Sequence, residues 1–182
     1  MPSGDTIVAC ATARGRSALA VVRVSGPATG ALLDRFVSGD PAARGVFERG
    51  LSLRDDACTL PIWVARSLAP ASYTGEDTAE LIVPGNPHLI DRIIERLCEM
   101  KYVRPAGPGE FTARAYLAGK LTLDEAEGVG AIIAARNQEE LAAAKDLLEG
   151  RAGAAYHAWA DEVTTLLALV EAGIDFTDQE DV

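Results

Sequence analysis

Three charged side chains interrupt otherwise apolar or helical patterns in this chain, and all three are of types that hold ligands. Arg23 lies within the apolar run LAVVRVS, Glu80 lies within TAELIV, and Lys120 follows Gly119 between two segments of helical character. Arginine and lysine donate hydrogen bonds to carbonyl or carboxylate oxygens, whereas a carboxylate accepts from a pair of N–H groups. The three residues therefore predict a site that binds a polar ligand, and the sequence shows no convincing catalytic acid–base pair.

Each of these residues also has a simpler interpretation. Arg23 could lie at a strand edge, with its stem buried and its guanidinium in water. Glu80 could belong, with Glu76 and Asp77, to a solvated acidic rim beside a turn. Lys120 could be an ordinary exposed lysine between two helices. The residues by themselves leave both interpretations open.

Six short apolar runs, rich in β-branched residues and bounded by turn residues, have the character of β-strands. The predicted strands are Thr6–Ala11, Leu19–Ser25, Val46–Leu53, Cys58–Ala65, Thr78–Val83 and Tyr102–Val103. A turn at Arg54–Asp56 would join the third and fourth strands as a hairpin. Apolar residues at helical spacing predict helices at Pro27–Val37 and Pro87–Met100.

The segment RPAGPGEFTARAYLAGKLTLDEAEGV, residues 104–129, would position Lys120. Its prolines and glycines predict a turn, followed by a helix that begins at Glu110 and ends at Gly119. A further helix begins after Thr122, the predicted N-cap of a capping box. Lys120 therefore lies in a short joint bounded by glycine, which would fix its side chain. The residues expected to face a core from the first helix are Phe111, Ala115 and Leu117.

The pattern is only helical in the last third of the chain. One helix is predicted over Asp124–Arg136, and one long helix runs from Gln138 toward Ala172. Apolar residues of the long helix recur at intervals of three, four and seven, which is typical of a helical bundle or an intersubunit face. These residues are Leu141, Leu148, Ala155, Trp159, Val163, Leu166 and Val170.

These elements predict an α+β protein, with a mixed sheet and helices over residues 1–119 and an all-α segment over residues 120–182. The formal net charge of −10 argues against a free-standing nucleic-acid binder, because phosphate contacts need clustered cations. The sequence has neither a signal-peptide pattern nor a membrane-spanning apolar run. Its cysteines, Cys10, Cys58 and Cys98, show no CxxC spacing. We therefore expect a soluble cytoplasmic protein with reduced cysteines, no metal site and no membrane partner.

A longer motif is carried by PGEFTARAYLAGKLTLDEAEGV. It resembles the signature PGEFT-x-RAF-L-N-GK-x-D-x-x-x-AE-A of the tRNA modification GTPase family MnmE, also called TrmE. The segments DTIVACAT, VVRVSGP and SYTGEDTAEL are similar to other parts of the family pattern, in the same order. LVEAGIDFTDQED resembles the family's helix that leads into its GTPase insertion. The resemblance spans nearly the whole chain.

The resemblance implies a fold and a function. The family's N-terminal domain is α+β, resembles tetrahydrofolate-binding aminomethyltransferase domains, forms homodimers, and binds 5-formyltetrahydrofolate or a related one-carbon tetrahydrofolate. Its folate-contacting residues correspond to Arg23, Glu80 and Lys120. Glu80 would pair with the pterin edge, and the two cations would contact carbonyl or carboxylate oxygens. Full-length members also use GTP, Mg and K. With the flavoprotein MnmG, they install an aminomethyl-type group on carbon 5 of the wobble uridine of tRNA.

The sequence also departs from the family pattern. It contains no G-x-x-x-x-G-K-[ST] phosphate loop, so the chain alone is not expected to hydrolyse GTP. The family's PPGRGG loop reads here as Ala13–Ala18, its HGG as Pro84–Asn86, and an asparagine before GK as Ala118.

Two interpretations follow from the resemblance and the departures. In the first, the chain is the folate-binding and dimerisation part of an MnmE-type GTPase. In the second, it is a divergent stand-alone binding or scaffold module without modification activity. An independent aminomethyltransferase is a weaker third, because a fold alone does not confer that reaction.

Overall fold

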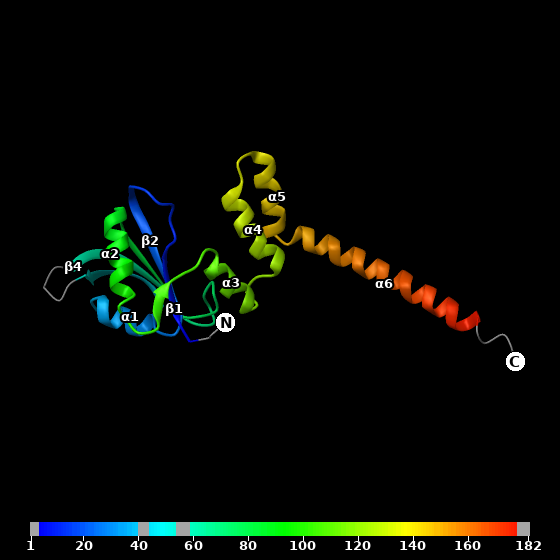
Figure 1. The fold of residues 1–182 in the computed structure, drawn as a ribbon, viewed down its shortest axis with the longest axis horizontal. Helices are drawn as coiled ribbons and strands as arrows, with labels where there is room; N and C mark the ends of the chain where they lie inside the picture. Colours follow the sequence, from blue (N-terminus) through cyan, green and yellow to red (C-terminus); the bar gives the residue numbers. More distant parts are fainter. Residues whose placement is uncertain (1–3, 40–43, 54–58, 178–182) are drawn as a thin grey trace. The chain divides into compact units, whose positions relative to one another are not determined.

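The computed structural model describes residues 4–39, 44–53 and 59–177, and of Ala152 and residues 175–177 it describes the backbone alone. The chain forms two compact units, Met1–Lys120 and Leu121–Val182 (Figure 1). The first unit contains the strands of the described chain together with α1, α2 and α3, and the second contains α4, α5 and α6.

The first unit is built on one six-stranded sheet in the order β3-β4-β5-β2-β1-β6. The strands are β1 Thr6–Cys10, β2 Ser17–Ser25, β3 Gly45–Ser52, β4 Thr59–Ser67, β5 Thr78–Gly85 and β6 Val103–Pro105. Neighbouring strands pair antiparallel, except that β1 and β6 are parallel. This mixed sheet confirms the predicted α+β class. The turn expected at Arg54–Asp56 lies outside the described residues.

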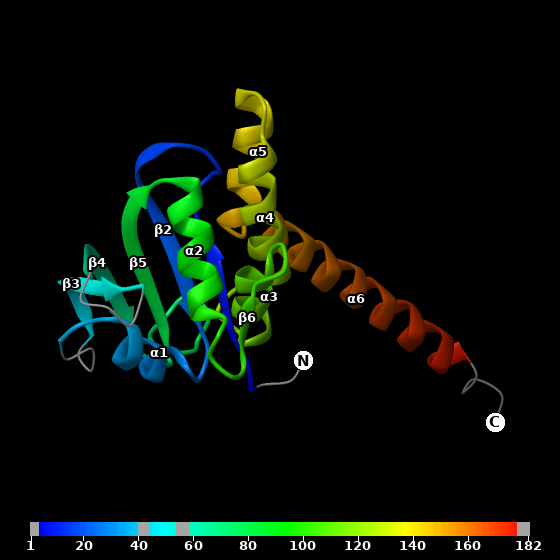
Figure 2. The same ribbon diagram turned by 60° about the vertical axis from the view of Figure 1, so that its left-hand side comes forward.

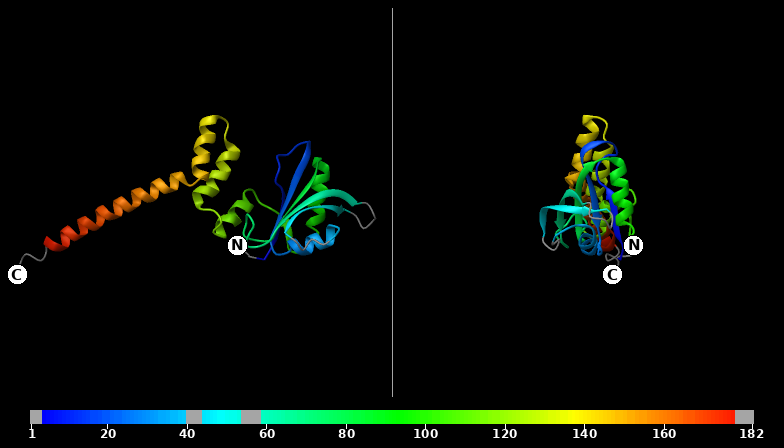
Figure 3. Two further views of the ribbon diagram at one scale, coloured as in Figure 1. Left: turned by 180° about the vertical axis from the view of Figure 1, so that it is seen from behind. Right: turned by 90° about the vertical axis from the view of Figure 1, so that its left-hand side faces the viewer.

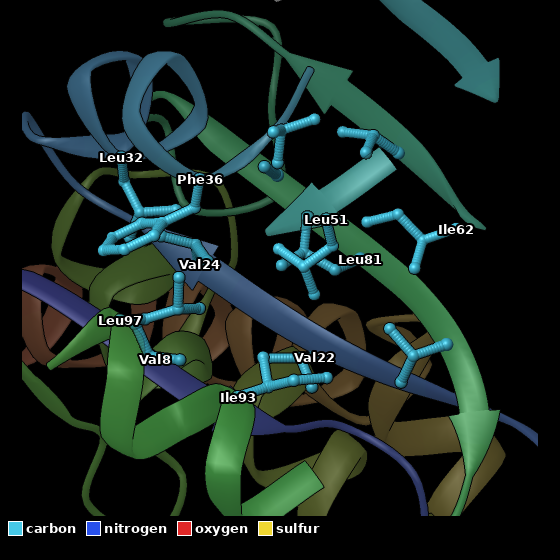
Figure 4. Close-up of a cluster of buried hydrophobic side chains, with 14 of the residues drawn as sticks. Val8, Val22, Val24, Leu32, Phe36, Leu51, Ile62, Leu81, Ile93 and Leu97 are labelled. Carbon is cyan, nitrogen blue, oxygen red and sulfur yellow. The ribbon is translucent and has the colours of Figure 1, made fainter. Parts of the chain in front are cut away.

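Two helices, α1 (Thr29–Phe36) and α2 (Pro87–Leu97), cover one face of the sheet, and Figure 2 shows α2 running along it. Both dock through an apolar stripe at helical spacing, as their sequences predict. Their buried side chains meet alternate residues of the strands in one core (Figure 4). Labelled members of this core are Val8, Val22, Val24, Leu32, Phe36, Leu51, Ile62, Leu81, Ile93 and Leu97. Burying each such side chain stabilises the unit by about 2 kcal/mol.

The opposite face of the sheet carries the intervening residues of each strand, because side chains alternate along a strand. Arg23 of β2 therefore shares this face with its cross-strand neighbours Ala9 of β1 and Glu80 of β5. Farther along the sheet the same face is apolar: Trp63 of β4 lies opposite Ile82 of β5, and Trp63 is about half exposed. One face of the sheet thus forms the core, and the other combines an ion pair with accessible apolar side chains.

The segment that positions Lys120 folds as a short helix between two turns. Helix α3 spans Glu110–Leu117, and Gly109 before it and Gly119 after it have left-handed φ angles of 69° and 68°. Ala115 is buried, as predicted, whereas the prediction for Leu117 is wrong, because its side chain is 63% exposed. Residues two apart point to nearly opposite sides of a helix, so Ala115 and Leu117 cannot both face one core.

The second unit begins with two adjacent helices, α4 (Leu123–Ala134) and α5 (Gln138–Leu148), which lie side by side in Figure 1. The predicted capping box is present: Thr122 Oγ1 accepts from Glu125 N, and Glu125 Oε2 accepts from Thr122 N. Gly128 permits close packing of the two helices, because a Cβ atom there would lie 2.5 Å from the backbone N of Leu148.

The single long helix predicted from Gln138 is wrong. The structure has α5 and then a separate helix α6, Arg151–Thr177, which is continuous over its length (Figure 3). Gly150 separates them with a φ of 69°, a left-handed conformation that ends α5. The apolar side chains of α6 within the described residues are exposed, and Tyr156 and Trp159 form an edge-to-face pair. No helix in the part of the chain that the structure describes has the length and apolar character needed to span a membrane.

Candidate functional site

Arg23 and Glu80 form an ion pair on the exposed face of the sheet. The two residues lie directly opposite each other on β2 and β5. Arg23 Nε donates to Glu80 Oε1 at 2.9 Å, and Arg23 Nη2 lies 2.8 Å from the same oxygen. The side chains are 32% and 37% exposed. Because β2 is an interior strand, Arg23 is not a strand-edge arginine with its head in water. Both contacts reach Oε1, and no hydrogen bond or ion pair within the described residues reaches Oε2, so Oε2 can accept from N–H donors of a ligand.

Two aromatic rings lie against the guanidinium of Arg23. Its Cζ atom is 5.8 Å from the ring centroid of Tyr73 and 5.6 Å from that of Phe111, within the range of cation–π attraction. The hydroxyl of Tyr73 lies 3.1 Å from Thr112 Oγ1, so the loop before β5 is joined to α3. The ion pair is therefore flanked by planar apolar surfaces on which a flat heterocycle can stack.

Lys120 lies beside the turn that leads into β5. Its backbone N–H donates to the carbonyl oxygen of Ala115 at 2.9 Å, which fixes the joint after α3. A Cβ atom built on Gly75 would lie 3.6 Å from Lys120 Cε and 3.0 Å from the Cβ of Ala118. Gly75 also has a φ of 78°, which favours glycine. The turn therefore needs glycine both for this backbone conformation and for the close approach of Ala118 and Lys120. Within the described part of the chain, the Lys120 ammonium has no ion-pair partner, and it is free to meet an anionic group.

The three predicted site residues thus lie in one region of the first unit. Arg23 and Glu80 are in direct contact. One loop connects them to Lys120: its Tyr73 ring lies over the Arg23 guanidinium, and its Gly75 lies beside the Lys120 side chain. The other two acidic residues predicted near Glu80 have different surroundings. Asp77 accepts a hydrogen bond from the backbone N–H of Ala69 at 2.9 Å, so it stabilises the loop.

Glu76 belongs to a second ionic group, which we call the Arg114 cluster: Arg114, Asp5, Glu76, Glu110 and Arg104. Arg114 reaches all three carboxylates, and Arg104 reaches Asp5 and Glu110. The side chain of Arg114 is only 15% exposed. The cluster joins α3 to the start of β1 and to the turn at residues 74–77.

The cluster favours the charged forms of Glu110 and Asp5. Hydrogen bonds from Arg104 outweigh the effect of burial and, with further bonds from Gly107 N–H and Arg114, lower the pKa of Glu110 from its ordinary 4.5 to about 2. Burial acts to raise the pKa of Asp5, but hydrogen bonds from Arg104 and Arg114 prevail and lower it. Burial acts to lower the pKa of Arg114, but its hydrogen bonds and charge interactions with Glu76, Asp5 and Glu110 together prevail and raise it.

Reasoning from the sequence missed Arg114, Tyr73 and the cluster as a whole. The spacing of Glu110 and Arg114 by four residues on one helix is a signal that could have indicated part of it. The contact between Asp5 and Arg114 joins residues 109 positions apart, and no local pattern indicates it.

The segments that depart from the family pattern lie in different places: Ala118 adjoins the Lys120 joint beside Gly75, and Pro84 is on β5 with Glu80. Ala13, Arg14 and Gly15 line a pocket of about 600 Å³ together with parts of β1, α2 and Ala106. Asn86 is the N-cap of α2, since its side chain accepts from Leu89 N at 3.2 Å. Among the described residues, no group of three or more histidine, cysteine or acidic side chains could hold a metal ion.

The two cysteines in the described residues, Cys10 and Cys98, are free and half-buried, and burial raises the pKa of Cys98. Cys58 lies outside those residues. The candidate site as a whole provides recognition groups: the Arg23–Glu80 ion pair, the rings of Tyr73 and Phe111, and the Lys120 ammonium, which has no ion-pair partner among the described residues.

Comparison with known proteins shows which family this chain resembles along its length. Residues 6–120, which include Arg23, Glu80 and Lys120, match the family model described as GTP-binding protein TrmE N-terminus. The chain is 41% identical over 179 residues to the tRNA modification GTPase MnmE of Gluconacetobacter diazotrophicus, covering 96% of this chain and 41% of that protein. It is 42% identical over 188 residues to the tRNA modification GTPase MnmE of Bradyrhizobium sp., covering 100% of this chain and 41% of that protein.

A mitochondrial protein of Danio rerio, described as 5-taurinomethyluridine-[tRNA] synthase subunit GTPB3, is 38% identical over 185 residues. That match covers 98% of this chain and 36% of the relative. The chain thus spans about two fifths of the length of the curated relatives it matches. With a family match over most of the first unit and similarity along its whole length, the chain belongs to the MnmE/TrmE family of tRNA modification GTPases, as an N-terminal part.

Proposed function

We propose that this chain binds a one-carbon tetrahydrofolate such as 5-formyltetrahydrofolate at Arg23, Glu80 and Lys120, as part of an MnmE-type tRNA-modifying protein. The observation that carries the proposal is the cross-strand pairing of Arg23 with Glu80 on the accessible face of the sheet, with the Lys120 joint beside the same loop. The chemistry of these groups fits the ligand, because a reduced folate offers N–H donors on its pterin ring and carboxylates on its glutamate tail.

Each group has a distinct role in this proposal. Glu80 accepts hydrogen bonds from the amino group and ring nitrogen of the pterin. Arg23 and Lys120 donate to carbonyl or carboxylate oxygens, and Tyr73 and Phe111 provide apolar surfaces for a ring. The bound folate supplies the one-carbon unit, while the protein orients it.

We further propose that two copies associate through the first unit. The face of the sheet that carries the ion pair also exposes large apolar side chains, including Leu19, Val46 and Trp63. Exposed apolar groups on a sheet face are typical of a surface that another protein covers. In the longer cytoplasmic protein, the folate would serve modification of the wobble uridine of tRNA at carbon 5, together with GTP, Mg, K and the flavoprotein MnmG.

The test is titration calorimetry of the chain with 5-formyltetrahydrofolate. We expect micromolar binding, on the order of −8 kcal/mol, for the unaltered chain. Glu80→Ala should weaken binding by at least about tenfold, because it removes the acceptor for the pterin and leaves Arg23 unpaired. Glu95→Gln is the matched control: Glu95 lies on α2, is 66% exposed, and pairs only with Arg92 among the described residues.

The outcomes separate the two interpretations of the sequence. Binding that is lost in Glu80→Ala and kept in Glu95→Gln places the folate at the ion pair. If the folded, unaltered chain releases no heat and does not bind in a competition assay, the folate proposal is wrong and the scaffold interpretation is favoured.

A further inference from the structure

Arg114 lies where three parts of the first unit meet, and it touches none of the proposed folate-binding residues. We propose that Arg114 is a positioning residue, which holds α3 and the turn at residues 74–77 against the start of β1, so that Phe111 and Lys120 stay beside the Arg23–Glu80 pair. The expected effect of Arg114 on ligand affinity rests on the proposed function. Its expected effect on the geometry around Arg23 is independent of that function.

Arg114 makes hydrogen bonds to all three of these parts. Its Nη1 donates to the backbone carbonyl of Asp5 at 3.0 Å and to both carboxylate oxygens of Glu76 at 3.1 and 3.0 Å. Its Nη2 donates to Asp5 Oδ1 at 2.8 Å and to Glu110 Oε1 at 3.3 Å. With its side chain 15% exposed, Arg114 is shielded from the solvent screening that weakens surface ion pairs. A planar guanidinium can bridge three acceptors in this way, whereas an ammonium cannot do so in one plane.

The contacts continue from Arg114 to the proposed site along two routes. On the first, Glu76 Oε2 accepts from Ser25 Oγ at 2.7 Å, and Ser25 is two residues after Arg23 on β2. The turn held in this way includes Gly75, which packs against Lys120, and follows Tyr73, whose ring lies on Arg23.

The second route runs along α3 itself. Phe111 precedes Arg114 by three residues, so the two side chains lie on neighbouring positions of one helix face. The ring of Phe111 contacts the Arg23 guanidinium, and the helix ends in the joint where Lys120 N–H bonds to the carbonyl of Ala115. A shift or rotation of α3 would therefore move Phe111 and Lys120 together.

Loss of Arg114 would leave some carboxylates of the cluster paired with a cation and others not. Arg104 would still pair with Asp5 and Glu110, but among the described residues it makes no contact with Glu76. Among the described residues, the Glu76 carboxylate would keep the Ser25 hydroxyl as its partner, and it would no longer share a cation with the carboxylate of Asp5. Repulsion between like charges would then move the turn away from β1.

The experiment compares Arg114→Gln, Arg114→Lys and Glu76→Gln with Arg104→Gln as the matched control. Arg104→Gln loosens the same cluster without breaking the contact to the turn. Two readouts are used on the whole chain, at a temperature where circular dichroism shows every variant to be folded. One is the Kd for 5-formyltetrahydrofolate, and the other is the ¹H–¹⁵N signal of Arg23 Nε, assigned by its loss in Arg23→Lys.

We expect Arg114→Gln to move the Arg23 Nε signal, since Phe111 and Tyr73 shift relative to the guanidinium, and to raise the Kd at least about tenfold. Glu76→Gln should act in the same direction more weakly, and Arg114→Lys should recover part of the affinity. Arg104→Gln should lower the melting temperature while leaving the Arg23 signal in place and the Kd within about threefold.

The two readouts keep this inference separable from the proposed function. If Arg114→Gln and Arg104→Gln leave the Arg23 signal equally unchanged, Arg114 is only a stabilising residue and the inference is overturned, whatever the affinity. If the unaltered chain binds no folate but Arg114→Gln alone moves the signal, the folate proposal fails and the positioning role stands. If Arg114→Gln unfolds the chain, Glu76→Gln decides: an unmoved signal in that variant overturns the inference.

Discussion

Replacing Glu110 by glutamine should remove a measurable and pH-dependent part of the stability of the first unit. The Glu110 side chain is 11% exposed, and its carboxylate accepts from Arg104, Arg114 and the backbone N–H of Gly107. Its pKa of about 2 lies well below the ordinary 4.5. At about 1.4 kcal/mol per pH unit, this difference corresponds to about 3 kcal/mol in favour of the folded state at neutral pH.

That figure is an upper bound, because Arg104 is 43% exposed and water and salt screen its charge. We expect Glu110→Gln to lower the free energy of unfolding by about 1.5–2 kcal/mol at pH 7. Glutamine keeps the length of the side chain and an acceptor for Gly107 N–H, so the loss reports mainly the charge. Glu95→Gln, on the exposed side of α2, should cost less than about 0.5 kcal/mol.

The sign of the pH dependence follows from the lowered pKa. Stability from Glu110 is fully present above about pH 4.5, where the carboxylate is charged in both states, and is lost as the pH falls through about 2. The difference between the unaltered chain and Glu110→Gln should therefore shrink toward zero between about pH 5 and pH 2. Asp5, whose pKa is also lowered, adds acid sensitivity common to both proteins.

Urea unfolding at a series of pH values measures this effect. The chain has two tryptophans, one in each unit, so a Trp159→Phe background leaves Trp63 to report on the first unit alone. If the Glu110→Gln protein is as stable as its parent at pH 7, the charged Glu110 carboxylate does not stabilise the first unit and the prediction is wrong. A difference that persists unchanged at pH 2 would show that the loss comes from packing and not from charge.

Two further substitutions, each compared with a control substitution, test the packing. Ile93→Ala in the core should lower the free energy of unfolding by about 2–4 kcal/mol, whereas Ile133→Ala on an exposed surface should cost under about 0.5 kcal/mol, both measured by urea unfolding. Gly75→Ala should destabilise the first unit by about 1–2 kcal/mol through its positive φ and should also weaken folate binding, because the new methyl group meets Ala118. Gly109→Ala carries a similar φ with no neighbour within 4 Å, so in thermal melting and calorimetry it should show the strain without the effect on the ligand.

The sequence by itself determined most of the secondary-structure elements and indicated the residue types of the candidate site. Runs of β-branched residues predicted the strands, and apolar spacing predicted the faces of α1 and α2 that are buried. Thr122 and Glu125 predicted the start of α4, because a capping box is a contact between residues three apart. These features depend on interactions within a few residues, which composition and periodicity record.

Periodicity failed where a single backbone angle decided the outcome. The apolar intervals continue across Gly150, so the pattern favoured one helix through that position. The left-handed φ of Gly150 separates α5 from α6 nonetheless. Glycine permits that conformation without requiring it, so its presence in the sequence does not determine where the chain turns.

Only the tertiary structure decided which charges meet. Arg23 and Glu80 are 57 residues apart, and their contact depends on the register of β2 against β5. A shift of one residue would place Glu80 on the core face instead. Arg114 and Asp5 are 109 residues apart, and their contact depends on where α3 docks against the start of β1. Short-range propensities do not encode such pairings, because register and docking are set by the packing of the whole unit around its core.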